Sequence, residues 1–333
     1  MPFIWFRLPG LMMLMLPLAW PAVAAAQSTS TGSGQAYPSR PIRLLVPAPP
    51  GGGTDLLGRM VAQKLTEKFH QQFIVDNRAG ASGMIASEIV ARADPDGHTL
   101  LICFTTHVTN PSLYPKMPYD TVRDFAPVAM VGMIPGVLVL HLSLPPQSVK
   151  EFIAYAKERP GKLNYGSAGN GSGTHLSTVL FSAMTGTSMV HVPYKGAVPA
   201  LTDLLAGQLH FMFGNMASSL PHIRSGKLRA LAVTSAKRSA SAPELPTIAE
   251  TGLPGYEATA WFALFAPART PAPIVNQLSG EVNALFKLPD VKERMLGLGA
   301  DAMPMTPREL GAYVETEIVK WGKLIKASGA KAD

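Results

Sequence analysis

Residues 42–55 read IRLLVPAPPGGGTD and predict a strand, a glycine-rich loop and the start of a helix. The mostly apolar run 42–46 is closed by prolines and glycines, which is typical of a short strand. From residue 56 to residue 69 apolar side chains recur at helical spacing, and Thr54 stands at a natural N-cap position. This order of strand, loop and amphipathic helix predicts one unit of a parallel α/β sheet.

The rest of the chain continues the alternation of strands and helices. The expected elements are strands 73–76, 99–104, 163–165, 189–193, 209–213 and 229–233 and helices 84–91, 149–158, 175–185, 198–205, 274–286, 291–298 and 307–326. Between the first and second sets, the almost uncharged stretch 128–142 predicts a strand pair that leaves the first sheet. The apolar stretch 259–267 could return the chain to that sheet. The predicted fold class is therefore α/β.

The length of 333 residues is near the upper limit for one compact domain, so we expect two α/β domains of about 100–200 residues each. Residues 37–138 and 263–333 are expected to form the first domain, and residues 139–262 the second. Two such domains would leave a cleft between them, which is a common place for a ligand.

The composition argues against several classes of protein. Hydrophobic residues make up 47% of the chain and charged residues 15%, so the chain is not intrinsically disordered. The 29 Lys and Arg exceed the 22 Asp and Glu, but the basic residues are scattered, which argues against a nucleic-acid surface and leaves small anions open as partners. The single cysteine, Cys103, lies in an apolar run and is expected to be a buried small hydrophobe.

The N-terminal residues 1–26 have the three parts of a secretory signal peptide. Arg7 supplies the positive charge, residues 11–20 supply the apolar run, and three alanines before Gln27 form a small-residue cleavage site. A transmembrane anchor is disfavoured because prolines interrupt a run already shorter than the roughly 20 residues that a span requires. We expect cleavage before Gln27, a flexible leader at 27–36 and a soluble exported protein.

Each half of the chain carries a glycine-rich loop between a strand and a helix start, at 47–55 and at 167–175. The first N–H groups of a helix are unpaired, and the helix dipole places roughly half a positive charge there. Glycines let the backbone approach a ligand, so each loop could bind a carboxylate or phosphate without a cationic side chain. Two facing loops would suit a small dicarboxylate. The alternative is that each loop only connects its strand to its helix.

Polar residues beside the two loops extend the candidate site. Thr105 and Thr106 follow the third strand, at the sheet edge where open α/β folds bind ligands, although they could instead cap a short helix. His175 could donate to an anion or be satisfied by local hydrogen bonds, and Asn215 offers a neutral donor after a later strand. Asp55, in a first helical turn, stabilises the helix dipole or could receive a ligand ammonium.

The sequence lacks the motifs of several enzyme classes. There is no G-x-x-x-x-G-K-[ST] loop and no G-x-S-x-G elbow, and a near match to a dinucleotide fingerprint at 169–174 has Thr174 in place of its last glycine. The eight histidines are at least nine positions apart, so no helical metal motif is present. We therefore expect binding rather than catalysis, with no metal and no cofactor.

The last predicted helix has one apolar stripe and several charged positions. We expect the stripe to pack in the core rather than on a membrane surface; its members are Leu310, Tyr313, Val314, Ile318, Trp321 and Ile325. The pair Glu315 and Glu317 is expected on the solvated face of this helix.

Several ordered motifs span residues 37 to 329: YPSRPIR at 37–43, VDNR at 75–78, PDGHTL at 95–100, HVPYKG at 191–196 and GKLRALAV at 226–233. With them the chain resembles the extracytoplasmic solute receptors of tripartite tricarboxylate transporters, the TctC or Bug family. The resemblance implies a type II periplasmic-binding-protein fold, in which two α/β domains joined by two crossover strands close on a ligand.

The resemblance also implies a function. It implies a monomeric periplasmic receptor that binds a small carboxylate and delivers it to the membrane permease subunits of a tripartite transporter, with no enzyme activity and no nucleic-acid partner. A receptor that reports ligand occupancy to a signalling partner, and an exported hydrolase or isomerase, stay open as alternatives.

Carried onto this chain, the resemblance places the two ligand loops at 48–55 and 167–175. Family members often have an aromatic residue where this chain has Ala48 and an acidic residue where it has Gly214 and Asn215, which disfavours an amino-acid ligand here. A dicarboxylate or an aromatic carboxylate is expected instead. The expected ligand-binding residues are Ala48, Pro50, Gly51, Gly52, Thr54, Asp55, Thr105, Thr106, Gly169, Asn170, Gly171, Ser172, His175 and Asn215.

Overall fold

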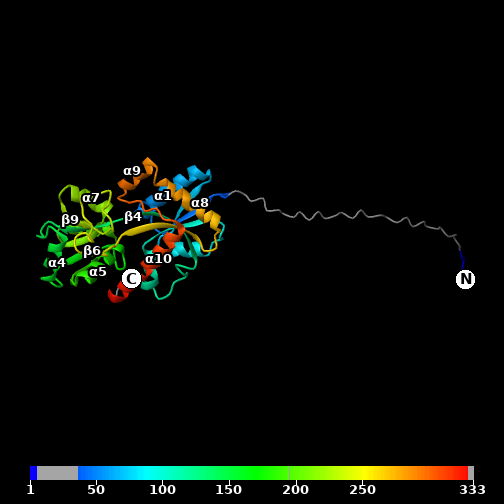
Figure 1. The fold of residues 1–333 in the computed structure, drawn as a ribbon. Coiled ribbons are helices and arrows are strands. Elements are labelled where there is room, and N and C mark those ends of the chain that lie inside the picture. Colours follow the sequence, from blue (N-terminus) through cyan, green and yellow to red (C-terminus); the bar gives the residue numbers. More distant parts are fainter. Residues whose placement is uncertain (6–36, 195, 329–333) are drawn as a thin grey trace. The chain divides into compact units, whose positions relative to one another are not determined.

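A computed structural model describes residues 1–5, 37–194 and 196–328 of the chain, which divides into two units, Met1–Ala36 and Tyr37–Asp333 (Figure 1). In the first unit the described residues 1–5 are exposed and form neither helix nor strand. Most of the predicted signal peptide and all of the predicted leader therefore lie outside the described residues. The second unit contains two five-stranded sheets.

The first sheet has the strand order β2-β1-β3-β10-β4. β1 (Ile42–Val46) pairs in parallel with β2 (Phe73–Asn77) and with β3 (Thr99–Phe104), as the alternation of strands and helices predicts. β10 (Ala260–Pro267) runs antiparallel between β3 and β4 (Phe125–Ile134). The expected return of the chain to the first sheet is thus confirmed.

The second sheet has the order β7-β6-β8-β5-β9. β6 (Asn164–Ser167) is parallel to β7 (Val190–Pro193) and to β8 (Phe211–Asn215). β5 (Gly136–His141) is antiparallel to β8 and to β9 (Leu228–Val233). The two sheets share one arrangement. In each, three parallel strands lie beside an antiparallel strand that the chain enters from the other sheet: β10 in the first sheet and β5 in the second. The predicted domain boundaries at 138 and 263 stay a prediction.

Helices cover the faces of both sheets (Figure 1). Their bounds are α1 (Gly53–Phe69), a short 3-10 helix η1 (Ala81–Gly83), α2 (Met84–Ala91), α3 (Thr106–Leu113), α4 (Val149–Lys157), α5 (Gly173–Thr185), α6 (Ala197–Leu205), α7 (Met216–Arg224), α8 (Ala272–Leu285), α9 (Pro289–Gly297) and α10 (Pro307–Ser328). α10 packs against α3 and β4 from the first sheet's side and against α5 from the second's. It therefore spans both halves of the unit.

Two details of the helices differ from the sequence prediction. α1 begins at Gly53 with Gly52 in the N-cap position, so the expected N-cap role of Thr54 is wrong: the extended backbone that precedes the helix belongs to Gly52. α7 was not predicted, because a nine-residue helix with Pro221 inside it has little apolar periodicity to detect.

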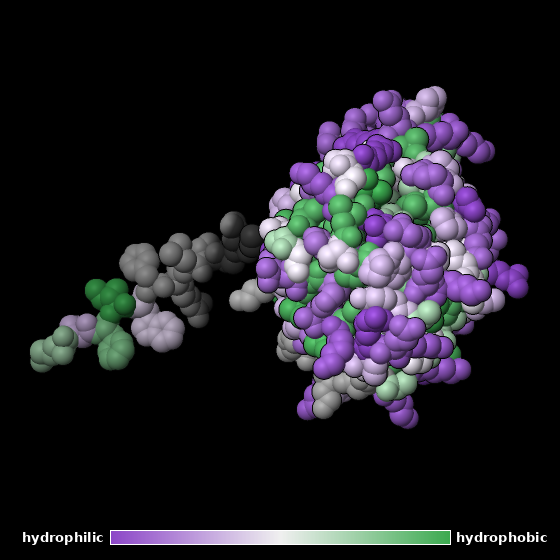
Figure 2. All heavy atoms as spheres, turned by 90° about the vertical axis from the view of Figure 1, so that its left-hand side faces the viewer, coloured by the Kyte–Doolittle hydropathy of each residue, from purple (hydrophilic) through white to green (hydrophobic). Residues whose placement is uncertain are grey.

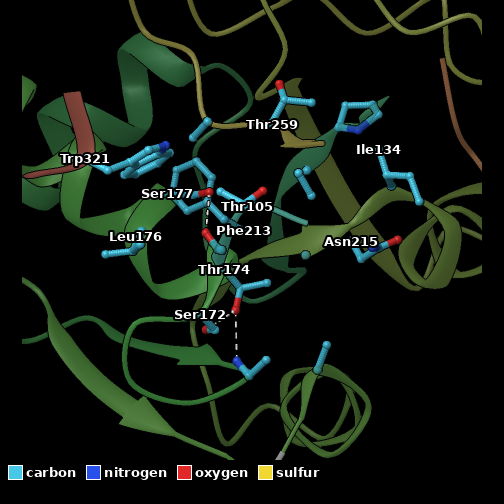
Figure 3. Close-up of a pocket in the computed structure, with 18 residues that line it drawn as sticks. Thr105, Ile134, Ser172, Thr174, Leu176, Ser177, Phe213, Asn215, Thr259 and Trp321 are labelled. Atoms are coloured by element: carbon cyan, nitrogen blue, oxygen red, sulfur yellow. Dashed lines mark hydrogen bonds between the residues drawn. The ribbon is translucent and has the colours of Figure 1, made fainter. Parts of the chain in front are cut away.

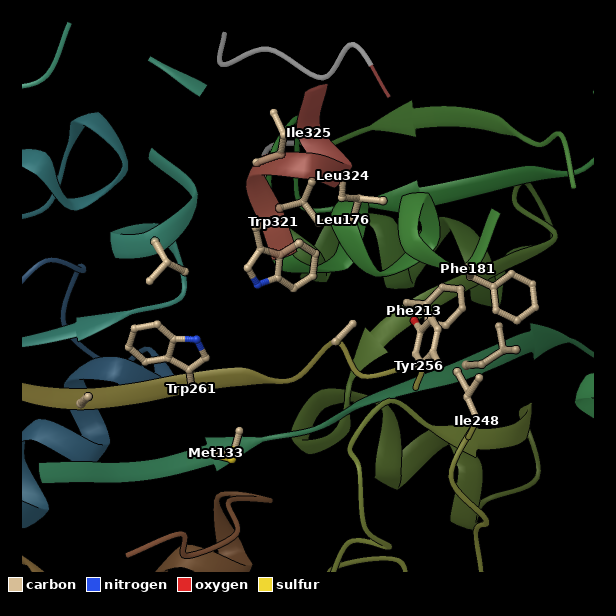
Figure 4. Packing of buried hydrophobic residues seen from close by; sticks show 14 of the residues in the cluster. Met133, Leu176, Phe181, Phe213, Ile248, Tyr256, Trp261, Trp321, Leu324 and Ile325 are labelled. Carbon is tan, nitrogen blue, oxygen red and sulfur yellow. The ribbon is translucent and has the colours of Figure 1, made fainter. Parts of the chain in front are cut away.

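The core forms on both faces of the sheets. Side chains from α1, α8 and α9 pack on one face of the first sheet, and α6 and α7 cover one face of the second. On the opposite faces one continuous cluster joins the two sheets, and α10 contributes Trp321 and Ile325 to it (Figure 4). Cys103 is buried in this cluster, as expected.

The chain passes between the sheets twice. Pro135 joins β4 to β5, and residues 258–260 lead into β10. Thr234 holds both passages: its Oγ1 accepts from Gly136 N at 2.8 Å, its N–H donates to Gly136 O at 2.9 Å, and its carbonyl oxygen accepts from Ala258 N at 3.0 Å. A Cβ on Gly136 would lie 3.0 Å from Thr234 Oγ1, so this close approach favours glycine.

The surface on the side of α4 and β9 is mostly polar, with apolar residues set among polar ones (Figure 2). Among the described residues, no helix combines the length and the apolar character that a membrane span would need.

The burial of β1 can be tested with a matched pair of substitutions. Ile42→Ala should lower the free energy of unfolding by about 2–5 kcal/mol, because the Ile42 side chain is fully buried in the cluster under α1. Ile74→Ala, on the neighbouring strand β2, should cost well under about 1 kcal/mol because Ile74 is 54% exposed. Chemical denaturation measures both values, and equal losses would contradict the assignment of the buried face.

Candidate functional site

Two adjoining pockets lie between the sheets, at the ends of β3, β6 and β8 (Figure 3). The first has a volume of about 230 Å³ and is bordered by both passages between the sheets, at Pro135 and at residues 258–260. The second has a volume of about 360 Å³ and shares Thr105, Ser172 and other residues with the first. Open α/β sheets bind ligands at this edge, outside the carboxyl ends of their strands.

The pockets bring together part of the predicted site. Thr105, Thr106, Asn170, Gly171, Ser172 and Asn215 line one or both pockets. Ala48, Pro50, Gly51, Gly52, Thr54, Asp55, Gly169 and His175 line neither. The second glycine loop thus lies at the pockets, whereas a ligand contact for the first loop stays a prediction.

The second loop is held rigidly by its own side chains. Ser172 caps α5: its Oγ accepts from His175 N at 3.3 Å and donates to Gly169 O at 2.7 Å. Thr174 Oγ1 accepts from Ala168 N at 2.8 Å. Gly169 and Gly171 have φ angles of 119° and 71°, which a residue with a side chain rarely adopts. The start of α5 at Gly173 therefore borders the first pocket in a fixed orientation.

Neutral polar side chains border the pockets from both sheets. Thr105 stands at the N-cap position of α3, but its Oγ1 accepts from Trp261 N at 3.2 Å rather than from the helix. Its hydroxyl proton is thereby available for another acceptor. Asn215 caps α7 with its Oδ1, which accepts from Ala217 N at 2.9 Å, so its amide N–H groups can donate elsewhere.

The first loop is organised around the buried carboxylate of Asp55. Asp55 accepts from Gly51 N at 2.8 Å, from Arg59 Nε at 3.0 Å and from Asn77 Nδ2 at 2.9 Å, and Asn77 also donates to Ala48 O at 2.9 Å. Burial opposes the ionisation of Asp55, but the hydrogen bonds from Arg59, Gly51 and Asn77 outweigh it and hold the pKa of this carboxyl below its usual value. The Asp55 carboxylate therefore already has hydrogen-bond partners within the loop and its surroundings.

The first loop nevertheless lies close to the first pocket. A Cβ placed on Gly53 would lie 3.3 Å from Ile134 Cδ1, and Ile134 lines that pocket. The start of α1 is thus separated from the pocket by one side chain.

His175 faces away from the two pockets. Its Nδ1 accepts from Gly171 N at 3.1 Å, and its ring stacks on His191 with the centroids 4.0 Å apart. It borders a separate groove with Tyr165 and Val179. The local hydrogen bonds that the sequence left as an alternative are present, and they fasten the second loop.

Thr259 and Trp321 are two of the lining residues that sequence reasoning missed. Thr259 is 4% exposed, and its Oγ1 has no hydrogen-bond partner among the described residues. Trp321 was assigned to the core stripe of the last helix and does pack there, but it also lines the first pocket. A core stripe carries no sign that one member borders a cavity, and a lone threonine before a strand carries no signal at all.

Glu317 contradicts the expectation that it lies on a solvated face. It is 3% exposed and accepts from Trp321 Nε1 at 2.7 Å and from Lys320 Nζ at 2.6 Å. The indole N–H and the ammonium provide the partners that a buried carboxylate requires. Glu315 is exposed, as expected.

The described residues that line the two pockets carry no formal charge. Within the described parts of the chain, no group of three or more His, Cys, Asp and Glu side chains is placed to hold a metal ion. The groups that the pockets offer are hydroxyls, the side-chain amides of Asn170 and Asn215, a helix start and apolar walls. This set can bind a small anion by hydrogen bonds and can enclose an apolar body.

The chain is similar to known proteins along most of its length. The family model described as "Tripartite tricarboxylate transporter family receptor" matches residues 57–330. Protein BugT of Bordetella pertussis is 39% identical over 311 residues, which cover 93% of this chain and 95% of BugT.

Solved structures agree with these sequence matches. A structure described as "R. palustris Rpa4515 with adipate" is 42% identical, has a TM-score of 0.76 and covers 89% of this chain and 99% of its own. MatC from Rhodopseudomonas palustris with bound malate is 34% identical, has a TM-score of 0.72 and covers 87% of this chain and 100% of its own. The two-domain α/β fold that the sequence predicts is thereby confirmed.

The role of Asp55 predicts a pH-dependent loss of stability. Asp55→Asn should lower the free energy of unfolding by about 1–3 kcal/mol at pH 7, because it weakens three hydrogen bonds to a buried carboxylate. The native pKa is depressed, so this contribution is complete above the ordinary value of 3.8 and is lost as the pH falls through the native pKa. Denaturation at pH 7 and at about pH 3 should show the gap between the proteins narrowing in acid.

Asp290→Asn is the matched control, since Asp290 also lies in a first helical turn and pairs with Lys64 but is 60% exposed. Its effect should be much smaller. A loss as large as that of Asp55→Asn, or a gap that widens in acid, would contradict the proposed network.

Proposed function

The chain belongs to the TctC or Bug family of tripartite tricarboxylate transporter receptors, which are periplasmic solute-binding proteins, and on this premise we propose that it captures a small carboxylate between its two sheets. We propose further that it delivers this ligand to the membrane permease subunits of a tripartite transporter. It does so as a monomer, by binding and release, without making or breaking a bond.

One observation carries the proposal: two uncharged pockets lie between the sheets, bordered by a helix start and by neutral donors. The start of α5 supplies a partial positive charge and N–H groups at Gly173 and Thr174. Thr105, Thr259 and Asn215 offer further donors around the first pocket. A carboxylate held in this way is not locked by a full ion pair, which suits a ligand that must be released again.

The class of ligand follows from what the pockets contain and from the relatives. Rpa4515 was solved with adipate and MatC with malate, which makes dicarboxylates the first candidates here. Aromatic carboxylates are the second class, because Phe213 and Trp321 border the first pocket. An amino acid fits less well, since an ammonium needs an acidic partner and none of the described lining residues provides one.

Capture requires the two halves of the protein to close on the ligand. The proposed moving parts are residues 37–138 with 263–333 and residues 139–262, after removal of residues 1–26 on export. Both passages between the sheets border the first pocket, so a ligand there would contact the segments about which the halves turn. Closure is driven by the greater affinity of the closed form for the ligand.

Thr259→Val tests the pocket directly. The Thr259 Oγ1 has no partner among the described residues, so its removal should leave the fold unchanged and weaken the binding of a carboxylate by roughly tenfold. Thr270→Val is the matched control, because Thr270 is also buried with an unpartnered Oγ1 but does not line either pocket. Calorimetric titration with adipate, malate and benzoate measures the affinities, and equal affinities for the two variants would contradict the site.

Gly51→Val tests the predicted role of the first loop. A valine is strained at the φ of 88° found at Gly51, so the loop should rearrange and the ligand should no longer raise the melting temperature. In the wild type a ligand at a hundredfold excess over Kd should add about 2.7 kcal/mol of stability. Gly161→Val is the control, because Gly161 has a φ of 69° and equally open surroundings but precedes β6, at the end of that strand away from the second loop, and lines neither pocket.

Thermal shifts with adipate, malate and benzoate would measure this effect. An undiminished ligand-induced shift in Gly51→Val would remove the first loop from the site.

A further inference from the structure

We propose that Trp321 is a specificity-determining residue, which selects carboxylates with an apolar body, and that Glu317 positions its indole. This inference rests on the proposed function and deepens it, because it names the class of ligand that the first pocket prefers. Under this proposal α10, the last helix of the chain, contributes to ligand specificity.

Trp321 reaches the pocket from α10, the helix that spans both halves of the unit. Its side chain is 2% exposed and lines the first pocket together with Leu176 and Phe213, which belong to the second sheet's half. Figure 3 shows the indole directed toward the pocket beside Ser177. The pocket therefore has an apolar wall built from both halves, and the wall is complete only where α10 packs against α5.

Most other polar groups of the pocket lie elsewhere on its surface, and they come from Thr105, Ser172, Asn215 and Thr259, at strand ends and helix starts. Ser177, beside the indole, already donates its hydroxyl proton to Gly173 O at 2.7 Å within α5. A ligand whose carboxylates reach these groups would place its middle against Trp321 and Leu176. A hydroxyl on that middle part would lose its water and gain no hydrogen bond from the indole face, which offers no ordinary donor or acceptor.

The indole is held by a buried acid. Trp321 Nε1 donates to Glu317 Oε2 at 2.7 Å, while Lys320 Nζ donates to Glu317 Oε1 at 2.6 Å and lies 5.0 Å from the indole centroid. The carboxylate is thus neutralised on one side and bound to the indole on the other. Because Glu317 is held by Lys320 and accepts from the indole N–H, it favours one orientation of the Trp321 ring.

Trp261 is a second buried tryptophan, and within the described parts of the chain its indole N–H lacks the acidic partner that Trp321 has. It too is buried, but its Nε1 has no hydrogen-bond partner among the described residues, and its side chain does not line the first pocket. Trp261→Phe is therefore a matched control for Trp321→Phe (Figure 4).

The test compares adipate, which has an unsubstituted methylene chain, with malate, which carries a hydroxyl. The wild type should bind adipate about tenfold or more tighter than malate, because malate is two carbons shorter, buries less apolar surface against the wall and carries a hydroxyl that loses its water there. In Trp321→Ala the affinity for adipate should fall about tenfold or more and that for malate little, so the preference collapses. Trp321→Phe, which keeps an aromatic wall, should retain most of the preference.

The positioning role of Glu317 has its own readout. Glu317→Ala should reduce the preference for adipate, and Glu317→Gln should restore it, because the glutamine amide oxygen can still accept from the indole N–H. A merely structural role would lower stability in both variants and leave the ratio of the two affinities unchanged.

Fluorescence gives an independent measurement that needs no truncation. Adipate should change the tryptophan emission of the wild type and of Trp261→Phe, and the change should be absent in Trp321→Phe. If Trp321→Ala does not fold, this comparison still tests whether bound adipate lies against Trp321. A change that persists in Trp321→Phe and is lost in Trp261→Phe would overturn the inference.

The outcomes separate this inference from the proposed function. A wild type that binds adipate, with a ratio of affinities that Trp321→Ala leaves unchanged, would overturn the inference while the proposed function stands. A wild type that binds malate more tightly than adipate would do the same. A wild type that binds none of adipate, malate and benzoate would overturn both.

Discussion

The arrangement of the molecule depends on the hydrogen bonds of Thr234. This buried residue binds the first passage between the sheets through Gly136 and the second through Ala258, so that both passages run side by side. Both passages line the first pocket, so these hydrogen bonds hold two parts of its wall together. This arrangement favours glycine at position 136, since a Cβ there would lie 3.0 Å from Thr234 Oγ1.

The pockets work without formal charge among their described lining residues, and this follows from the fold. Where β6 ends, the chain turns through two glycines in left-handed conformations and starts α5 beside the cavity. The backbone thereby supplies the positive potential that a lysine or arginine would otherwise provide. The uncharged side chains set the shape and polarity of the pocket. The last helix, α10, contributes to the pocket wall through Trp321.

Much of the fold could be predicted from the sequence, because strand and helix patterns are local. The two glycine loops were found for the same reason. The first pocket could not be predicted in full, since it depends on contacts between distant residues: Thr105 accepts from Trp261 N across 156 positions, and Trp321 arrives from the last helix. Glu317 was misplaced because its burial depends on two partners, Lys320 and the Trp321 indole, that a pattern of charges does not reveal.

A crystal structure of the exported protein grown with adipate would test the central claim most directly. The account predicts adipate between the two sheets, with a carboxylate oxygen within hydrogen-bond distance of the α5 start at Gly173 or Thr174 and with its methylene chain against Trp321. Adipate bound only in the groove bordered by Tyr165 and Val179, with none between the sheets, would contradict it.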